Sequence, residues 1–217
     1  MGRTKEVTVA NLHPPVATQM KRKATGDPLI PPVNSWFIHS PSTDAKGLRT
    51  VPVSYEQRPI TLTIQDAYSP FEPSAFIEGS PRKTLTLNLT REWDDALECF
   101  EACLLREMAV KSLEVFGRTL GQAEVQEMYK PLSRKVGEYP RNLRAKLNTA
   151  GFYAATFWAA DKTRLVHRPE APESLAGRTL NVRVALRAIW IGDDAWGVVA
   201  DCTDVQLTPM APEVCPF

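Results

Sequence analysis

The residues best suited to chemistry lie in one stretch near the C-terminus, residues 178–207. Arg183 and Arg187 alternate there with apolar residues, and Trp190 and Trp196 flank a Gly-Asp-Asp turn. A guanidinium group binds phosphate or carboxylate oxygens, and an indole ring stacks on other flat rings. Four residues apart on one strand, the two arginines would lie about 13 Å apart on the same face. The stretch therefore predicts binding to several anionic groups and at least one flat ring.

Two preceding segments repeat this combination of cations and rings. Alternation in NLRAKLN points Arg144 and Lys146 away from the core, and the segment FYAATFW leads into a turn with two more cations. Tyr139 and Phe157 are additional candidate rings, and alternation does not decide which rings point outward, because rings in a small barrel are more often core. The predicted binding residues are Arg144, Lys146, Tyr153, Trp158, Lys162, Arg164, Arg183, Arg187, Trp190 and Trp196.

Enzyme chemistry has little support in the sequence. The chain contains no phosphate-binding glycine loop, dinucleotide motif, metalloprotease motif or serine-hydrolase motif. The acidic residues of REWDD (91–95) and the pair Asp193 and Asp194 could hold a nuclease metal, but they also suit a helix N-terminus and a hairpin turn. Cys99 and Cys103 lack two further ligands at metal-site spacing. We expect no catalytic residue, no cofactor and no metal.

Charge is unevenly distributed along the 217 residues. The chain has 26 Lys and Arg against 25 Asp and Glu, for a net charge of +1. Residues 118–191 carry thirteen basic and six acidic residues, a net charge of +7, whereas residues 192–217 carry five acidic residues and no basic one. A basic segment of this kind is typical of a face that binds a polyanion.

The hydrophobic period changes twice along the chain. Residues 60–68 and 83–90 alternate, as in strands with one buried face. Residues 90–117 then have the spacing of an amphipathic helix, a shorter helix is predicted at 121–136, and alternation returns after Gly137. A small barrel with a helical connection is the pattern of the OB-fold. We predict a mainly β, α+β fold, namely an OB-like antiparallel barrel of five to six strands with a long helix between strands.

The same patterns predict how the chain is divided. Residues 1–34 are rich in Pro, Thr, Lys and Arg without a sustained period, which predicts a flexible N-terminal arm. Residues 35–208 form a single OB-like domain with its helical insertion at about 90–136. Residues 209–217 form a C-terminal tail.

One combination of motifs spans the C-terminal third. EYPRNLRAKLN is followed by an aromatic strand and by the hairpin VRVALRAIWIGDDAWGVVADCTDVQL. This combination resembles the single-stranded DNA-binding proteins of large nucleocytoplasmic DNA viruses, which have a YP…L…K segment before a terminal hairpin. The matching positions are Tyr139, Pro140, Leu143, Lys146, Trp190, Gly197, Val205 and Gln206. The resemblance implies an OB-type core that coats exposed strands during replication or recombination.

We therefore predict a single-stranded DNA-binding protein that uses basic strand faces and aromatic stacking, largely independent of sequence. RNA as ligand, a homo-oligomer, and replication proteins that dock through Phe217 stay open as further partners, and no membrane is expected. The alternative function is a virion or scaffold protein whose β core self-assembles. The absence of an apolar leader and of a cysteine framework predicts an intracellular protein, cytoplasmic, nuclear or at a viral replication site, that is not secreted.

Overall fold

The chain forms one mixed β-sheet and a group of helices. The computed structural model describes residues 29–43, 47–75, 77–165 and 174–208. The long strands are β3 (Arg49–Ser54), β4 (Ile60–Ser69), β6 (Arg82–Asn88), β8 (Asn142–Asn148), β10 (Arg178–Ile191) and β11 (Trp196–Leu207). The short strands are β1 (Phe37–Ile38), β2 (Ser42–Thr43), β5 (Ser74–Ala75), β7 (Ser133–Arg134) and β9 (Thr156–Trp158). The helices are the 3₁₀ turn η1 (Val33–Ser35), α1 (Glu92–Val110), α2 (Ser112–Phe116) and α3 (Gln122–Met128).

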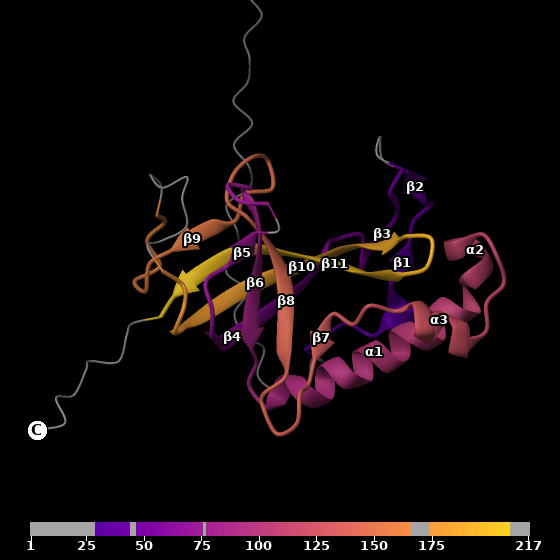
Figure 1. Ribbon diagram of the computed structural model, residues 1–217, viewed down its shortest axis with the longest axis horizontal. Helices are drawn as coiled ribbons and strands as arrows, with labels where there is room; N and C mark the ends of the chain where they lie inside the picture. Colours follow the sequence, from indigo (N-terminus) through magenta and orange to yellow (C-terminus); the bar gives the residue numbers. More distant parts are fainter. Residues whose placement is uncertain (1–28, 44–46, 76, 166–173, 209–217) are drawn as a thin grey trace, which may run out of the picture.

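Five strands close into a ring. β10 pairs with β4, β4 with β6, β6 with β8, β8 with β11, and β11 again with β10 (Figure 1). The strand pairing in the ring is shortest between β4 and β6, where Tyr68 and Asn88 are the paired residues. β11 runs parallel to β8 and β9, whereas the other pairings of the ring are antiparallel. The predicted OB-like α+β fold is confirmed. The parallel pairs of β11 differ from the predicted barrel, in which all strands were antiparallel.

The interior of the ring comes from strict alternation. Leu85 and Leu87 of β6 are fully buried, as are Leu62 and Ile64 of β4, while the residues between them face outward. β10 and β8 contribute a further set of buried side chains, Leu143, Leu147, Leu180, Val182, Val184 and Leu186. Because period-2 burial needs a fixed register, this core sets which side chains reach the outer face.

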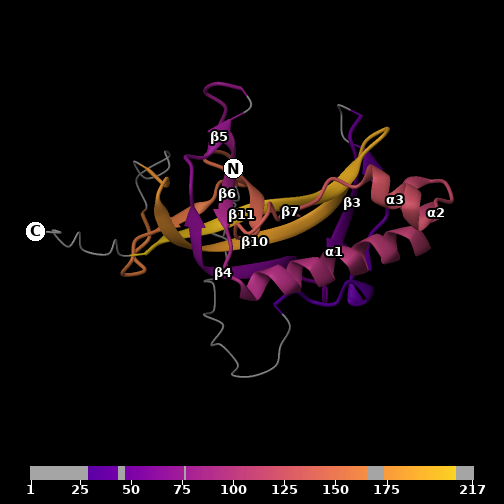
Figure 2. The same cartoon turned by 60° about the horizontal axis from the view of Figure 1, so that its bottom comes forward.

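The β10–β11 hairpin is longer than the ring. Beyond the ring it pairs with β3, and Figure 2 shows α1 running alongside this extension. The pairing of β10 with β11 shifts register between Arg183 and Val184 and again between Leu186 and Ala188. Such irregularities bend a strand locally and increase its twist. They let one pair of strands serve both the ring and the extension.

Helix α1 forms because its sequence supplies an apolar stripe and an acidic first turn. Glu92, Asp94 and Asp95 lie at the N-terminal end, where negative charge favours the helix dipole. The predicted stripe is confirmed by its buried members, Trp93, Leu97, Phe100, Leu104 and Met108. After α2, Gly117 adopts φ 74°, a left-handed conformation that glycine reaches without steric cost. The second predicted helix is shorter than expected, because α3 ends before Pro131.

The N-terminal boundary of the folded part lies earlier than predicted. Ile30 and Val33 are buried, and Trp36 packs on Phe100 of α1 with ring centroids 5.4 Å apart. Residues 29–34 therefore belong to the packed structure, and their assignment to a flexible arm was wrong, because single apolar residues in a proline-rich segment give no periodic signal. Residues 1–28 and the tail 209–217 lie outside the described residues, so those parts of the domain prediction stay predictions.

A buried arginine joins α1 to the ring. Arg141, just before β8, lies 3.5 Å from Glu98, 3.9 Å from Asp94 and 4.0 Å from Glu101, all on α1. Its Nη1 donates a hydrogen bond of 3.0 Å to Ser133 Oγ.

Among the described helices, none combines the length and hydropathy needed to cross a membrane.

Gly197 is required by a close approach inside the hairpin. A Cβ at this position would lie 2.9 Å from Nε1 of Trp190 and 3.0 Å from the carbonyl oxygen of Lys130. We expect Gly197→Ala to lower the free energy of unfolding by about 1–3 kcal/mol, because the indole and the backbone must both shift. Gly192→Ala is the control in the same hairpin, since its Cβ would meet ordinary contacts of 3.4 Å. Equal midpoints for the two variants in urea denaturation would contradict the expectation.

Candidate nucleic-acid interface

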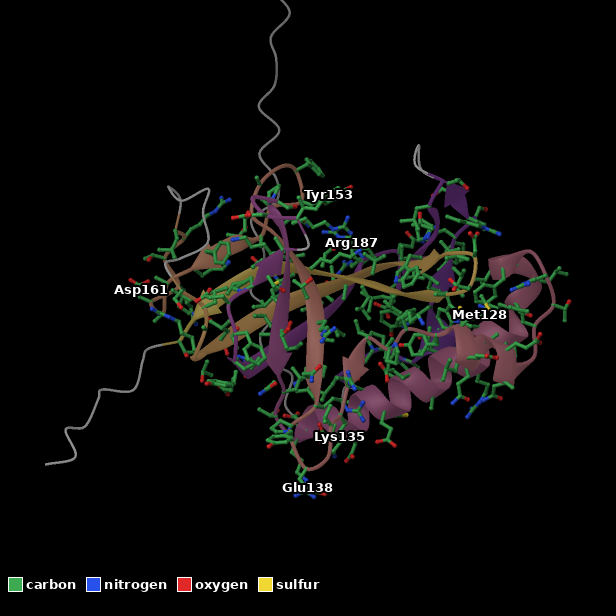
Figure 3. The ribbon with its side chains drawn as sticks, viewed as in Figure 1. Met128, Lys135, Glu138, Tyr153, Asp161 and Arg187 are labelled. Carbon is green, nitrogen blue, oxygen red and sulfur yellow. The ribbon has the colours of Figure 1, made fainter. Side chains whose placement is uncertain are left out.

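Arg187 of β10 and Tyr153 of the loop between β8 and β9 form the first group of the candidate interface. The guanidinium carbon of Arg187 lies 5.0 Å from the centroid of the Tyr153 ring, and the two side chains adjoin in Figure 3. Nε of Arg187 lies 2.8 Å from Oδ2 of Asp201, which holds the guanidinium in place. Tyr153 remains 57% exposed, so part of its ring is accessible to a ligand. A cation and an accessible ring are thus fixed side by side.

Lys146 extends this group onto β8. It is in register with Asp201 of β11, so two cations flank one carboxylate and the group keeps a positive charge. Partial burial lowers the pKa of Lys146, and the nearby charge of Arg82 lowers it further, against the opposing effect of Asp201. An added anion would favour the charged form of Lys146 and relieve this repulsion. The arrangement is suited to phosphate binding.

A second group lies at β9. Nε1 of Trp158 donates a hydrogen bond of 3.0 Å to Oδ1 of Asp204, and Nη1 of Arg183 lies 3.9 Å from Oδ2 of the same carboxylate. Trp158 is half-buried, so only part of its ring is available for stacking. Asp204 therefore orders one ring and one cation, and it also offsets part of the charge of Arg183.

Three predicted cations lie on the surface around these groups. Arg144 is exposed on β8 and forms no ion pair with another described residue. Lys162 and Arg164 are exposed in the turn after β9. Asp161, which precedes this turn, lies at the end of the molecule away from Met128 (Figure 3). These three cations flank the face, and no carboxylate of the described residues forms an ion pair with them.

The two tryptophans of the hairpin differ in their surroundings. Trp196 is 0% exposed and packs between Phe116 and Tyr129, so its assignment as a stacking residue was wrong. Its side chain faces the helical segment, whose packing an alternating strand pattern does not reveal. Trp190 is half-buried against Gly197, which leaves its predicted role untested. Phe157, the other buried candidate ring, also packs in the core.

Sequence reasoning missed exposed rings on neighbouring elements. Phe37 and His39 of the β1 segment form an edge-to-face pair with centroids 4.6 Å apart. Phe152 is 95% exposed and contacts Tyr153 edge-on. Alternation contained the signal for the first pair. In a strand where Trp36 and Ile38 face inward, Phe37 and His39 face outward.

Comparisons with known proteins place the chain near phage proteins. No protein-family model matches the chain, and no curated protein matches it. The solved single-stranded DNA-binding protein from bacteriophage Enc34 in complex with ssDNA is 15% identical with a TM-score of 0.46, covering 81% of this chain and 98% of its own. The single-stranded DNA-binding protein gp2.5 encoded by bacteriophage T7 is 12% identical with a TM-score of 0.47, covering 72% and 90%. With TM-scores below 0.5, these similarities do not determine the function of this chain.

Proposed function

We propose that this protein binds single-stranded DNA on the outer face of its ring, with little dependence on sequence. The observation that carries the proposal is the fixed pair of Arg187 and the exposed Tyr153 ring, with Lys146 beside it. Cations along a face neutralise phosphates, and an open ring stacks on any base, since every base has a π-face. This combination suits a flexible single strand, whose bases are free to leave the stack.

The carboxylates on β11 define how such a strand would be held. Asp201 and Asp204 leave most guanidinium donors of Arg187 and Arg183 free, because each carboxylate contacts one guanidinium nitrogen. They also keep the face from becoming strongly cationic, which favours a strand that can be released. A role in coating strands during replication or recombination rests on the resemblance of the C-terminal third, and it is part of the proposal.

Salt-dependent titration tests this proposal. We expect an oligo(dT) strand to quench tryptophan fluorescence, with affinity that falls as NaCl rises. Changing Arg183 and Arg187 together to Gln should reduce the slope of log affinity against log salt by about 1.4, from two phosphate contacts at about 0.7 each. Gln is preferred to Ala because its amide can still donate a hydrogen bond to the neighbouring carboxylate.

A matched pair of substitutions controls for net charge. Arg118 and Lys130 are both exposed; Arg118 contacts Sδ of Met128, and Lys130 follows Met128 by two residues. Met128 lies on the helical side of the molecule (Figure 3). Changing both to Gln removes the same charge and should leave the salt slope unchanged. Wild-type protein that binds oligo(dT) without salt dependence, or not at all, would reject the proposal and favour self-assembly. If the slope of log affinity against log salt fell equally in the two double variants, binding would depend on net charge and not on this face.

A further inference from the structure

A cavity of about 550 Å³ opens next to the outer face of the ring. It lies between the β1 segment, the end of β3 and the turn that leads into β4, and Arg187 lines its border with the ring. Arg187 therefore contributes both to the Tyr153 pair and to this cavity. Its volume lies within the range of sites for small organic ligands. A strand bound at Arg187 would therefore lie beside the cavity.

One wall of the cavity is an accessible ring. Phe37 is 62% exposed although it lies in a paired strand. Its orientation is fixed by the edge-to-face contact with His39, whose Nε2 lies 3.0 Å from Oγ of Ser54. Val53 and Pro59 add apolar surface. An exposed ring held by its neighbours loses little entropy on binding a flat ligand, which is the requirement for a stacking platform.

The rim also includes a tight two-residue turn. Tyr55 and Arg58 exchange two backbone hydrogen bonds of 2.9 Å around it. Glu56 and Gln57 between them have φ angles of 48° and 60°, the positive values that a type I′ turn requires at both central residues. Here the turn places two hydrogen-bonding side chains and Arg58 around the cavity. A flat ring, polar edge groups and two arginines are the chemical complement of one nucleotide.

We propose that this cavity receives one base of the bound strand, an inference that rests on the proposed function. The base stacks on Phe37, and its edge faces the side chains of Glu56 and Gln57. The phosphates on either side lie at Arg58 and Arg187. The cavity thus anchors the strand at one point, beside the sequence-tolerant contacts at Tyr153.

Removal of the Phe37 ring tests the inference. We expect Phe37→Ala to lower the affinity for oligo(dT) by about 5- to 150-fold, as for loss of one stacked base, with an unchanged salt slope because no cation is lost. Phe37→Trp keeps a ring and should retain most of the affinity. Phe71→Ala is the control, since this ring is 67% exposed and lines neither the cavity nor the Arg187–Tyr153 pair.

A second measurement needs no substitution. An oligo(dT) strand with one 4-thiothymidine, irradiated on wild-type protein, should crosslink to the peptide that contains Phe37 and His39. Crosslinks confined to other peptides, or wild-type affinity for oligo(dT) in Phe37→Ala, would overturn the base site while leaving the proposed function intact. Wild-type protein without salt-dependent binding to oligo(dT) would instead overturn the proposed function.

Discussion

Replacement of Trp196 by Ala is expected to lower the free energy of unfolding by about 3–5 kcal/mol, because a large ring leaves a cavity that its surroundings fill only in part. The indole lies 4.6 Å from the Tyr129 ring and 5.8 Å from the Phe116 ring, measured between centroids. Its Nε1 donates a hydrogen bond of 2.8 Å to the carbonyl oxygen of Val125 in α3. The substitution therefore removes packing and leaves a buried carbonyl without its donor.

Chemical denaturation with urea measures this loss. Phe152→Ala is the control, since it deletes a ring that is almost fully exposed and should change the free energy of unfolding by about 0.5 kcal/mol or less. A Trp196→Ala variant with wild-type stability and weakened binding to oligo(dT) would show that Trp196 belongs to the binding face. Loss of stability with unchanged affinity of the folded fraction would confirm its place in the core.

Substitution of Arg141 by Met is expected to cost about 3–5 kcal/mol of stability, because it leaves the largely buried carboxylate of Glu101 without its cation, whereas Asp94 keeps its ion pair with Lys135. The Arg141 side chain is largely buried, as are those of Asp94 and Glu101. Burial raises the pKa of Glu101, although the hydrogen bonds from Ser133 and the charge of Arg141 act against this rise. Met keeps the length of the apolar stem, so the loss reports mainly on charge.

The pH dependence of this loss has a defined sign. Without Arg141, the pKa of Glu101 in the folded state rises further above its value in the unfolded chain. A carboxyl of this kind destabilises the fold once the pH exceeds its unfolded pKa, because the unfolded state releases the proton more readily. The difference in unfolding free energy between Arg141→Met and wild type should therefore be small at pH below the ordinary glutamate pKa and should grow as the pH rises to neutrality.

Two variants make this expectation sharp. Glu98→Gln removes the exposed partner of the same arginine and should cost about 1 kcal/mol or less. Glu101→Gln added to Arg141→Met removes the unpaired charge and should recover part of the lost stability. A loss in Arg141→Met that does not change with pH would show that packing, not charge, is the cause.

The sequence by itself determined the elements and the inward faces. The change from period 2 to period 3.6 located α1 and its buried stripe. Alternation located the buried leucines of β6 and four of the buried residues of β10, namely Leu180, Val182, Val184 and Leu186. These predictions succeeded because burial of apolar side chains follows the local periods of strand and helix. The charge distribution also indicated that cations gather on β8 and β10, since alternation points them away from the core.

Only the tertiary structure decided what those outward residues do. Arg187 meets Tyr153 and Asp201 because a loop and a neighbouring strand bring them together, and no local period encodes such contacts. Trp196 became core because the helical segment covers that part of the hairpin, although its strand pattern matched that of exposed rings. Phe37 reached the outer face through the pairing of β1 with β3. Local alternation determines on which face of the sheet a side chain lies, but the contacts of that side chain depend on which strands are neighbours in the fold.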